Sequence, residues 1–288
     1  MVPFKVDLTK EVAVVTGGGG VLCSGFAESL AECGAHVAVC DLRLDAAQAV
    51  VDKIVAAGGD AAAFEMNVLD RDSIEAAKAK INEKFGAVTL LLNGAGGNNP
   101  KGSTTRDTLT PEDLEELDKN GTIEGVKTFF DLDPAGISFV FNLNFLGTLI
   151  PTQVFAREMA KTGGTIINVS SMNAFRPLTR IPAYSGAKAA VSNFTQWLAV
   201  HFAPVGIRVN AIAPGFFLTN QNRALLINPD GSLSARSAKI LAHTPMNRFG
   251  VPEDLTGTLL WLADKNASGF VSGVVVPVDG GFAAYSGV

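Results

Sequence analysis

An apolar run and four consecutive glycines stand together in the stretch Glu11-Val12-Ala13-Val14-Val15-Thr16-Gly17-Gly18-Gly19-Gly20-Val21-Leu22-Cys23. The β-branched run predicts a short buried strand, and the residues after the glycines begin a helical pattern. Glycines between a strand and a helix let the backbone approach a pyrophosphate, and the helix N-terminus adds N–H donors. We therefore predict a phosphate-binding loop. The alternative is a flexible turn, which would cost conformational entropy to no purpose.

Similar strand patterns recur along the chain, each followed by small or polar residues. After the first, such runs lie at His36–Cys40, Val88–Leu92, Thr165–Val169 and Ile207–Ile212. Helical patterns such as Leu44–Ala57 and Asp70–Phe85 separate them. Buried strands that alternate with helices predict an α/β, Rossmann-type, doubly wound parallel sheet of about seven strands, flanked by helices. We expect one domain over residues 1–288, with ligands bound at the carboxyl ends of the strands.

The composition excludes several classes of protein. Hydrophobic residues make up 47% of the chain and charged residues only 18%, which indicates a well-buried globular domain. The net charge of −5 gives no electrostatic footprint for nucleic acid. Cys23, Cys33 and Cys40 match no metal or redox spacing, nor do the three histidines. We expect no metal site and three buried, reduced thiols.

The chain shows no signal for a membrane. Residues 1–10 contain neither a long apolar run nor a cleavage site, so a signal peptide is not expected and the predicted location is cytoplasmic. The longest apolar stretch, Ile137–Phe155, includes Asn142, Asn144 and Pro151. It is too short and too polar to span a bilayer. We interpret it as a buried helix.

Polar and small residues follow the other predicted strands. Asp41 stands where a carboxylate accepts hydrogen bonds from a ribose 2'-hydroxyl and repels a 2'-phosphate, which favours NAD(H) over NADP(H). Arg43 could pair with such a phosphate. Asn67 and Val68 could contact an adenine ring, and the turn Asn93–Gly97 lets the backbone pass close to a cofactor. The cofactor contacts predicted from these elements are Gly17, Gly18, Gly19, Gly20, Val21, Leu22, Asp41, Asn67, Val68, Asn93, Ala95 and Gly96.

Ser171, Tyr184 and Lys188 form a candidate catalytic group. If the residues after Pro182 are helical, Tyr184 and Lys188 stand four apart on one face. An ammonium beside the tyrosine favours the phenolate and lowers its pKa from about 10 toward a working range. A serine hydroxyl at the same point could hold a substrate oxygen. By spacing alone, the pair could equally be a surface lysine over a packed tyrosine.

Taken in order along essentially the full length, these markers resemble the short-chain dehydrogenase/reductase family. The matching pieces are Thr16-Gly17 with the glycine run, Asp41, Asn93-Gly94-Ala95-Gly96, Asn144-Phe145-Leu146-Gly147, Ser170-Ser171, Tyr184-x-x-x-Lys188, Arg208-Val209-Asn210, Pro214-Gly215 and Asp279-Gly280-Gly281. The resemblance implies that Tyr184 is the acid/base and that Ser171 orients the substrate oxygen. It also implies that Lys188 lowers the tyrosine pKa and, like Tyr184, contacts the cofactor at the nicotinamide ribose.

Further roles follow from the same resemblance. Asn144 would support a water-linked proton relay, and homodimers or homotetramers would be common. Pro214, Gly215, Phe217 and Thr219 would flank the nicotinamide, although Phe217 could equally be a hydrophobic loop anchor.

The chain departs from the family pattern in its cofactor loop. Val21 and Cys23 stand where the family usually has glycines, which puts the phosphate contacts in doubt. Asn67 replaces the more usual aspartate, and Gly94 stands in the Asn-Asn-Ala-Gly element.

An insertion is the largest departure, and it falls around residues 98–136. That segment holds four basic and nine acidic residues, so its balance of 4 − 9 = −5 equals the net charge of the chain. Thr110-Pro111-Glu112-Asp113 predicts a helix N-cap with proline at the first helical position. A loop of this length is usually functional or disordered. We expect a lid beside the site, with an interface or a solvated loop as alternatives.

Four segments resemble the short-chain type of D-mannonate oxidoreductase, also called fructuronate reductase. They are Asn93–Pro100, Phe129–Asp133, Ser171–Phe175 and Asp279–Val288. The resemblance implies interconversion of D-fructuronate and D-mannonate with a nicotinamide cofactor. A sugar acid needs at least one cation and several amides around it. The candidate substrate contacts are Asn98, Asn173, Arg180 and Arg223.

Three functions remain open from the sequence. The first is an NAD(H)-dependent sugar-acid oxidoreductase. The second is a gluconate, polyol or 3-oxoacyl reductase of the same family. The third is a catalytically silent dinucleotide-binding protein. The complete set of Asn144, Ser171, Tyr184 and Lys188 argues against the third, because a protein that only binds has no need of Tyr184.

Overall fold

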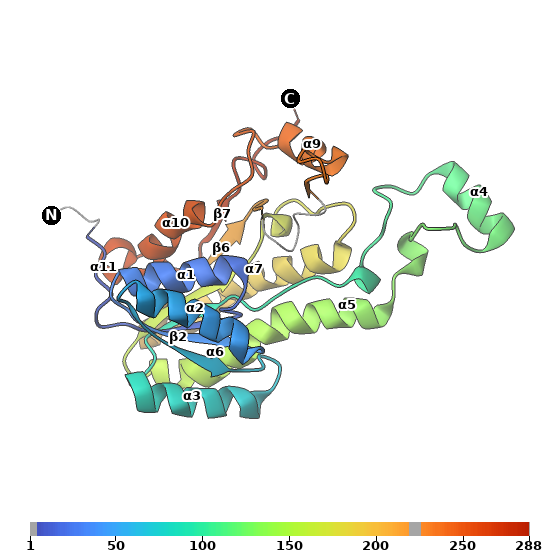
Figure 1. Ribbon diagram of the computed structural model, residues 1–288. Helices are drawn as coiled ribbons and strands as arrows, with labels where there is room; N and C mark the ends of the chain where they lie inside the picture. The colour runs from blue at the N-terminus through green and yellow to red at the C-terminus, as the bar shows by residue number, and fades with distance from the viewer. Residues whose placement is uncertain (1–4, 219–225, 288) are drawn as a thin grey trace.

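The computed structural model describes residues 5–218 and 226–287, which form a sheet between two layers of helices (Figure 1). Its strand order is β3-β2-β1-β4-β5-β6-β7, and neighbouring strands are parallel. The strands are β1 Val12–Thr16, β2 His36–Asp41, β3 Asp60–Glu65, β4 Leu90–Asn93, β5 Gly164–Val169, β6 Ile207–Pro214 and β7 Val275–Val278. The predicted doubly wound, seven-stranded parallel sheet is confirmed.

Helices connect the strands and cover both faces of the sheet. The α-helices are α1 Val21–Glu32, α2 Leu44–Ala56, α3 Arg71–Phe85, α4 Pro111–Asn120, α5 Pro134–Phe141, α6 Gly147–Met159, α7 Pro182–Phe202, α9 Ala235–Ala242, α10 Glu253–Ala263 and α11 Lys265–Ser268. The helices predicted at 44–57 and 70–85 form, each one residue shorter. At the second, Asp70 is the N-cap, and its side chain accepts hydrogen bonds from the backbone N–H groups of Asp72 and Ser73.

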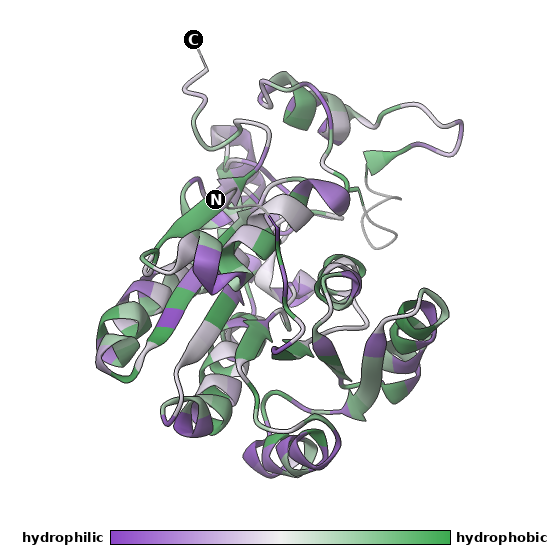
Figure 2. Ribbon diagram, turned by 90° about the vertical axis from the view of Figure 1, so that its left-hand side faces the viewer, coloured by the Kyte–Doolittle hydropathy of each residue, from purple (hydrophilic) through white to green (hydrophobic). Residues whose placement is uncertain are grey.

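Alternate residues of each strand face opposite helical layers. On β1, Ala13 and Val15 pack with α1, α2 and α10, whereas Val12 and Val14 pack with α3, α6 and α7. Figure 2 shows the strands mainly in the colours of apolar residues, while hydrophilic residues are concentrated on the helices. Both faces of the sheet are therefore buried, which explains the continuous apolar runs in the sequence.

The expected buried helix at 137–155 is part of a longer one. A π-helical turn, η3 Asn142–Leu146, joins α5 to α6, so that helical residues run from Pro134 to Met159. By length and composition this stretch could cross a membrane, contrary to the expectation that it is too short. Half of its apolar window is nevertheless buried inside the fold, where Val154, Phe155 and Met159 pack on the sheet.

The three cysteines are free thiols, as expected, but they are not equally buried. Cys23 and Cys40 are buried, and burial raises the pKa of both thiols, that of Cys23 to about 12. Cys33, at the end of α1, is only half-buried, so the expectation of three buried thiols is wrong for this one. Within the described ranges, no group of three or more His, Cys, Asp or Glu side chains could hold a metal ion.

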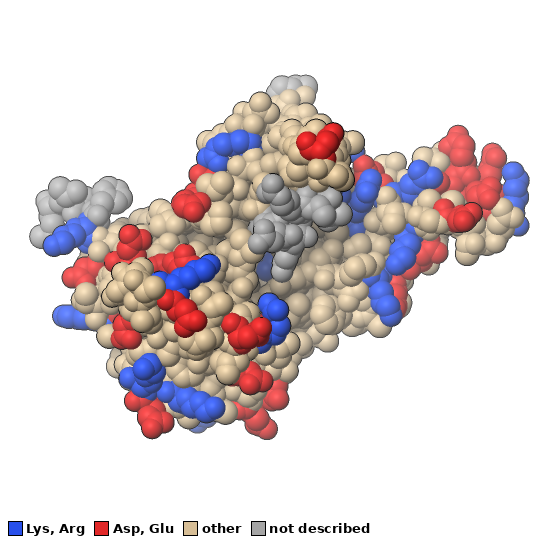
Figure 3. Space-filling model, in the orientation of Figure 1, with Lys and Arg blue, Asp and Glu red and all other residues tan. Residues whose placement is uncertain are grey.

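The insertion forms an arm. It contains the 3-10 turns η1 Pro100–Gly102 and η2 Phe129–Asp131, α4 and the start of α5. α4 begins as predicted, with a capping box in which Thr110 and Asp113 each accept a hydrogen bond from the backbone of the other. Figure 1 shows α4 standing clear of the sheet and α7, and Figure 3 shows acidic side chains gathered on it. At the base of the arm, residues 104–107, Thr104 N donates to Arg180 O at 2.9 Å and Asp107 pairs with the Arg180 guanidinium.

Arg208 joins the last strands to the helices beside them. From β6, its guanidinium donates to the carbonyls of Leu262 and Ser268 at 2.9 and 3.1 Å, and to that of Val271 at 3.4 Å. It also donates to the hydroxyls of Thr165 and Ser268. One side chain therefore donates to backbone carbonyls in α10, in α11 and in the loop before β7.

We expect Arg208→Met to lower the free energy of unfolding by about 3 kcal/mol, because those carbonyls lose charged donors. Urea denaturation measures this change. The control is Arg248→Met, since Arg248 forms an exposed ion pair with Asp254 whose loss should cost less than about 1 kcal/mol. An Arg208→Met cost no larger than that of the control would contradict the structural role.

Candidate active site

The carboxyl ends of β1 and β4 meet at one edge of the sheet. The Thr16 hydroxyl, at the end of β1, accepts hydrogen bonds from Gly94 N at 3.0 Å and Ala95 N at 3.1 Å. Gly17 has a φ of +64°, and a Cβ there would lie 2.8 Å from Ala95 Cα. The strand order reverses between these strands, so the two loops border the crevice where such sheets bind ligands.

The glycine loop is closely packed. A Cβ on Gly18 would lie 2.6 Å from Val39 Cγ1, and one on Gly19 would lie 2.6 Å from Ala46 Cβ. Gly20 is the N-cap of α1 and provides no side-chain cap for the N–H groups of the first turn, which begins at Val21 and Leu22. The loop is therefore not a flexible turn, and uncapped N–H donors at a helix start fit a phosphate group.

Cys23 and Gly94 explain two departures from the family pattern together. Cys23 lies on α1 under the loop after β4, and a Cβ on Gly94 would overlap its Sγ atom and lie 2.8 Å from Thr16 O. The sulfur therefore occupies the space that a side chain at position 94 would need. The larger residue at position 23, near the start of α1, is therefore compensated by a glycine at position 94, in the loop after β4.

Asp41 ends β2 beside the glycine loop. Its Oδ2 atom accepts a hydrogen bond from Gly19 N at 3.1 Å, and its Oδ1 atom accepts one from Arg43 N at 3.0 Å. The backbone thus fixes a half-buried carboxylate at the crevice, with lone pairs left for a ligand. Farther along the same edge, Asn67 is exposed and accepts a hydrogen bond from the N–H of Leu69. Val68 is buried.

Asn93 points away from the crevice. Its amide nitrogen donates to Thr152 Oγ1 and to Asn168 Oδ1, each at 2.9 Å, inside the layer between sheet and helices. Asn168 in turn donates to Thr195 on α7. The Asn93 side chain therefore links β4, β5 and α6, and the contact predicted for Asn93 would have to come from its backbone. Ala95 and Gly96, by contrast, lie in the loop that borders the crevice.

Ser171, Tyr184 and Lys188 lie together, because α7 begins at Pro182 as expected. The Ser171 side chain is close enough to the Tyr184 hydroxyl to lower the pKa of the phenol by hydrogen bonding. Lys188 is buried, with Nζ 5.6 Å from the centre of the Tyr184 ring, and it donates to Val169 O at 2.8 Å. These contacts place a hydroxyl pair and an ammonium at the end of β5, next to the loop after β4.

The pKa values differ from the sequence-based expectation. Burial raises the pKa of Tyr184 above its usual value, and the hydrogen bond from Ser171 only partly offsets this rise. Burial also lowers the pKa of Lys188 to about 8. The expected lowering of the tyrosine pKa is therefore absent, because desolvation of the phenolate outweighs the influence of an ammonium that is directed at a backbone carbonyl.

Asn144 lies in the π-helical turn and faces the same site. Its amide nitrogen donates to Gly97 O at 2.7 Å and Val140 O at 2.8 Å. A Cβ on Gly96 would lie 2.6 Å from Asn144 Oδ1 and 3.1 Å from Lys188 Nζ. Gly96 therefore permits the close approach of Asn144 and Lys188, and π-turns of this kind are frequent at functional sites.

The predicted substrate contacts are placed differently from one another. Asn173 is buried beside Ser171, and its Oδ1 atom has no hydrogen-bond partner within the described part of the chain. Asn98 is exposed and donates to Ser103 Oγ. Arg180 is paired with Asp107 of the arm, at 2.6 Å. Arg223, like the predicted cofactor contact Thr219, lies outside the described residues.

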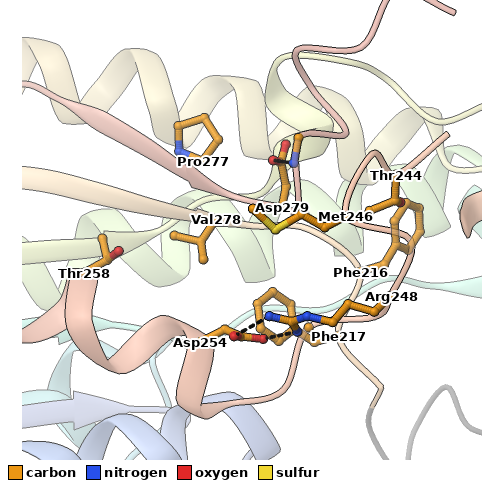
Figure 4. A pocket seen from close by; sticks show the side chains of 13 residues that line it. Phe216, Phe217, Thr244, Met246, Arg248, Asp254, Thr258, Pro277, Val278 and Asp279 are labelled. Atoms are coloured by element: carbon orange, nitrogen blue, oxygen red, sulfur yellow. Dashed lines mark hydrogen bonds and ion pairs between the residues drawn. The ribbon is translucent and has the colours of Figure 1, made fainter.

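The loop after β6 borders a second cavity, of about 410 Å³ (Figure 4). Gly215 packs on Asp279, while Phe217 is buried against Gly250, as expected for a loop anchor. Figure 4 shows the Arg248–Asp254 ion pair next to Phe217 on one side of the cavity. The residues that line this cavity do not include Ser171, Tyr184 or Lys188, so the candidate catalytic group lies outside it.

Known proteins match this chain over nearly its whole length. Residues 11–229 match the family described as short chain dehydrogenase. An uncharacterized oxidoreductase of Bacillus subtilis is 55% identical over 289 residues, which cover 100% of both chains. A 2-dehydro-3-deoxy-D-gluconate 5-dehydrogenase of Dickeya dadantii is 32% identical over 286 residues, which cover 99% of this chain and 100% of the relative.

A solved structure from Haemophilus influenza is also similar. It contains bound NAD and carries the provisional name D-mannonate oxidoreductase. The two chains are 52% identical, each is covered to 100%, and the TM-score is 0.92. The match in length shows that this neighbour spans the whole of the present chain, including its arm.

The Cys23–Gly94 contact predicts coupled mutations. We expect Gly94→Ala to destabilise the protein by about 3 kcal/mol through overpacking, and Cys23→Gly to cost about 1–2 kcal/mol. The double variant should lose at least about 1 kcal/mol less than the sum, because the sulfur clash is gone. Denaturant titration of the four proteins measures the coupling. Gly94→Ala combined with Cys33→Gly is the control and should be additive; additivity in both pairs would refute the contact.

Lys188 predicts a pH dependence of stability. Because its pKa falls from 10.5 to about 8 on folding, the unfolded chain binds more protons between these values, and stability rises with pH there. Relative to Lys188→Met, the wild type should gain about 2 kcal/mol from pH 8 to pH 10. Urea titrations at several pH values test this. The exposed Lys80→Met should show no such difference from wild type, and a parallel course for Lys188→Met would rule out the shift.

Proposed function

The chain belongs to the short-chain dehydrogenase family, and from that premise we propose that it is an NAD(H)-dependent oxidoreductase acting on a sugar acid. The proposed reaction interconverts the ketone of D-fructuronate and the secondary alcohol of D-mannonate. The observation that carries the proposal is the grouping of Ser171, Tyr184 and Lys188 at the end of β5, beside a glycine loop and a fixed carboxylate. The name of the NAD-bound neighbour supports the substrate.

The cofactor would be held along the crevice. The first turn of α1 would bind its phosphates, and Asp41 would accept the ribose hydroxyls, which favours NAD(H) over NADP(H). Pro214 and Gly215 would flank the nicotinamide, which supplies or accepts the hydride when bound. A 2'-phosphate would meet the negative charge of Asp41.

The proton would move through the hydroxyl of Tyr184. In the reducing direction Tyr184 protonates the substrate oxygen, and in the oxidising direction its phenolate removes the alcohol proton. Ser171 holds the same oxygen through its hydroxyl. When Lys188 carries its proton, its positive charge favours the phenolate form of Tyr184. The pKa of Lys188, about 8, leaves this amine mostly protonated at neutral pH. Asn144, which like Lys188 lies against Gly96 in the loop after β4, would support a water-linked relay.

We also propose that the chain forms a homo-oligomer. On α7, Trp197 and Val200 are 56% and 78% exposed, and Phe139 and Phe141 on α5 are also exposed. Apolar side chains of this size on neighbouring helices fit a subunit interface.

A second substrate class has specific support. The Dickeya relative is named for a related keto-sugar acid, so a gluconate-type substrate would use the same site. A catalytically silent dinucleotide-binding protein would have no catalytic use for the buried Ser171 and Lys188 side chains.

The proposed function is tested by an NADH oxidation assay on fructuronate, tagaturonate, 5-ketogluconate and an acetoacetyl thioester, repeated with NADPH. We expect fructuronate with NADH to give the highest kcat/KM. A preference for the thioester would refute the sugar-acid proposal, and a preference for 5-ketogluconate would favour the gluconate type. NADH binding without turnover of any substrate would favour the silent binder.

Tyr184→Phe should lower kcat by about 10²–10⁴-fold, because the proton has no other carrier of comparable position. NADH affinity, measured by fluorescence, should stay near the wild-type value. The matched control is Tyr285→Phe, which changes the other tyrosine of the chain and should keep full activity. A Tyr184→Phe variant with normal turnover would exclude Tyr184 as the acid/base.

A further inference from the structure

A cavity of about 360 Å³ lies between the segment before α7, the loop after β6 and α9. Its walls include Asp107, Arg180, Phe216, Arg236, Lys239 and His243. Phe216 also lines the cavity of Figure 4, so the two are neighbours. Residues 177–180 belong to the stretch that runs from Ser171 to Tyr184, so the cavity borders the segment that joins two members of the proposed catalytic group in the chain.

The walls of this cavity are positively charged. Arg180, Arg236 and Lys239 supply three positive charges and Asp107 supplies one negative charge, so the balance is 3 − 1 = +2 with His243 neutral. The chain as a whole carries −5. A concave surface that opposes the sign of the whole molecule attracts anions.

Asp107 is fully engaged by two of the three cations. Its Oδ1 atom accepts hydrogen bonds from Arg180 Nε at 2.6 Å and from Thr179 Oγ1 at 3.1 Å, and its Oδ2 atom accepts one from Lys239 Nζ at 2.6 Å. The hydrogen bonds from Lys239 and Arg180 hold the pKa of this carboxyl well below its usual range. Asp107 therefore stays ionised, and it joins the base of the arm to the catalytic side and to α9.

Arg236 is the one of these three cations that is not hydrogen-bonded to Asp107. It is half-buried in the first turn of α9, and its guanidinium forms no hydrogen bond or ion pair with any residue that the structure describes. Burial lowers its pKa, the positive charge of Arg180 adds to that shift, and the negative charge of Asp107 opposes it. A partly desolvated guanidinium without an acceptor is costly, and a carboxylate satisfies it with two parallel hydrogen bonds.

We propose that Arg236 binds the carboxylate of the substrate, and that the arm contributes Asp107 to fix Arg180 and Lys239 as the walls of this subsite. The inference rests on the proposed function, since it requires an acidic substrate whose ketone reaches Tyr184. Arg180 is already paired with Asp107. Arg236, which belongs to no sequence motif, therefore binds the negative charge of the substrate in its place. In this arrangement the arm affects substrate binding through Asp107 at its base, and α4 takes no part.

Three ketoses that differ only at C6 test this assignment: D-fructuronate has a carboxylate there, D-fructose a hydroxymethyl group and D-fructose 6-phosphate a phosphate. Arg236→Gln should raise the KM for fructuronate by about 30-fold or more, because the half-buried charge partner of the carboxylate is lost. kcat/KM for fructose should stay the same. Arg236→Lys should fall between, since it keeps the charge without the fork of donors.

The control is Arg248→Gln, which removes an arginine already paired with Asp254 in the neighbouring cavity and should leave all three substrates unaffected. NADH binding and thermal unfolding show whether Arg236→Gln is folded. A KM for fructuronate within about threefold of wild type in the folded variant would overturn the assignment. A wild-type preference for fructose 6-phosphate would also overturn it, in favour of a phosphate.

Failure of the proposed function has a different signature. In that case the wild type would turn over no acidic ketose in preference to a neutral one. Calorimetric titration of the NADH complex with D-mannonate then decides the subsite separately. Binding to the wild type that is lost in Arg236→Gln supports a carboxylate site, and equal binding to both proteins refutes it.

Discussion

The contact between the loops that leave β1 and β4 is the constraint on which the rest of the structure depends. Because β1 lies between β2 and β4, the chain winds outward in both directions from the centre of the sheet, and both loops end at the same edge. The Thr16 hydroxyl joins them through two backbone N–H groups. Glycine at positions 17 and 94 allows the two backbones to come this close, and the crevice between the loops is formed by the protein alone.

A buried polar network carries this arrangement to the catalytic side. Asn93 links β4 to Asn168 on β5, and Asn168 links to Thr195 on α7, the helix that carries Tyr184 and Lys188. Amides in a dry layer are costly when unpaired, so each bond restricts the position of its neighbour. The network therefore sets the depth at which α7 lies against the sheet. It also explains why an asparagine next to the crevice turns its side chain inward.

The fold was predictable because its signals are local. Strands buried on both faces read as continuous apolar runs, and α3 and α4 begin at capping residues visible in the sequence. The site was predictable because the carboxyl ends of parallel strands lie at the same edge of a sheet. Three features were not: the inward turn of Asn93, the raised pKa of Tyr184 and the cavity around Arg236. Each depends on which atoms come together in the folded chain, and Arg236 lies in a polar segment far from any motif. Asp107, at the base of the arm, forms an ion pair with Arg180 and none with Arg236.

The sulfur of Cys23 beneath Gly94 limits the order in which this loop could have evolved. A chain with glycine at both positions has only a small gap, which a protein core tolerates at modest cost. A chain with cysteine at 23 and any larger residue at 94 has overlapping atoms. The glycine at 94 must therefore have come first, and the cysteine second. Once both were present, position 94 could no longer change alone without overlap with the sulfur, whereas Cys23 could still return to glycine at the modest cost of that gap.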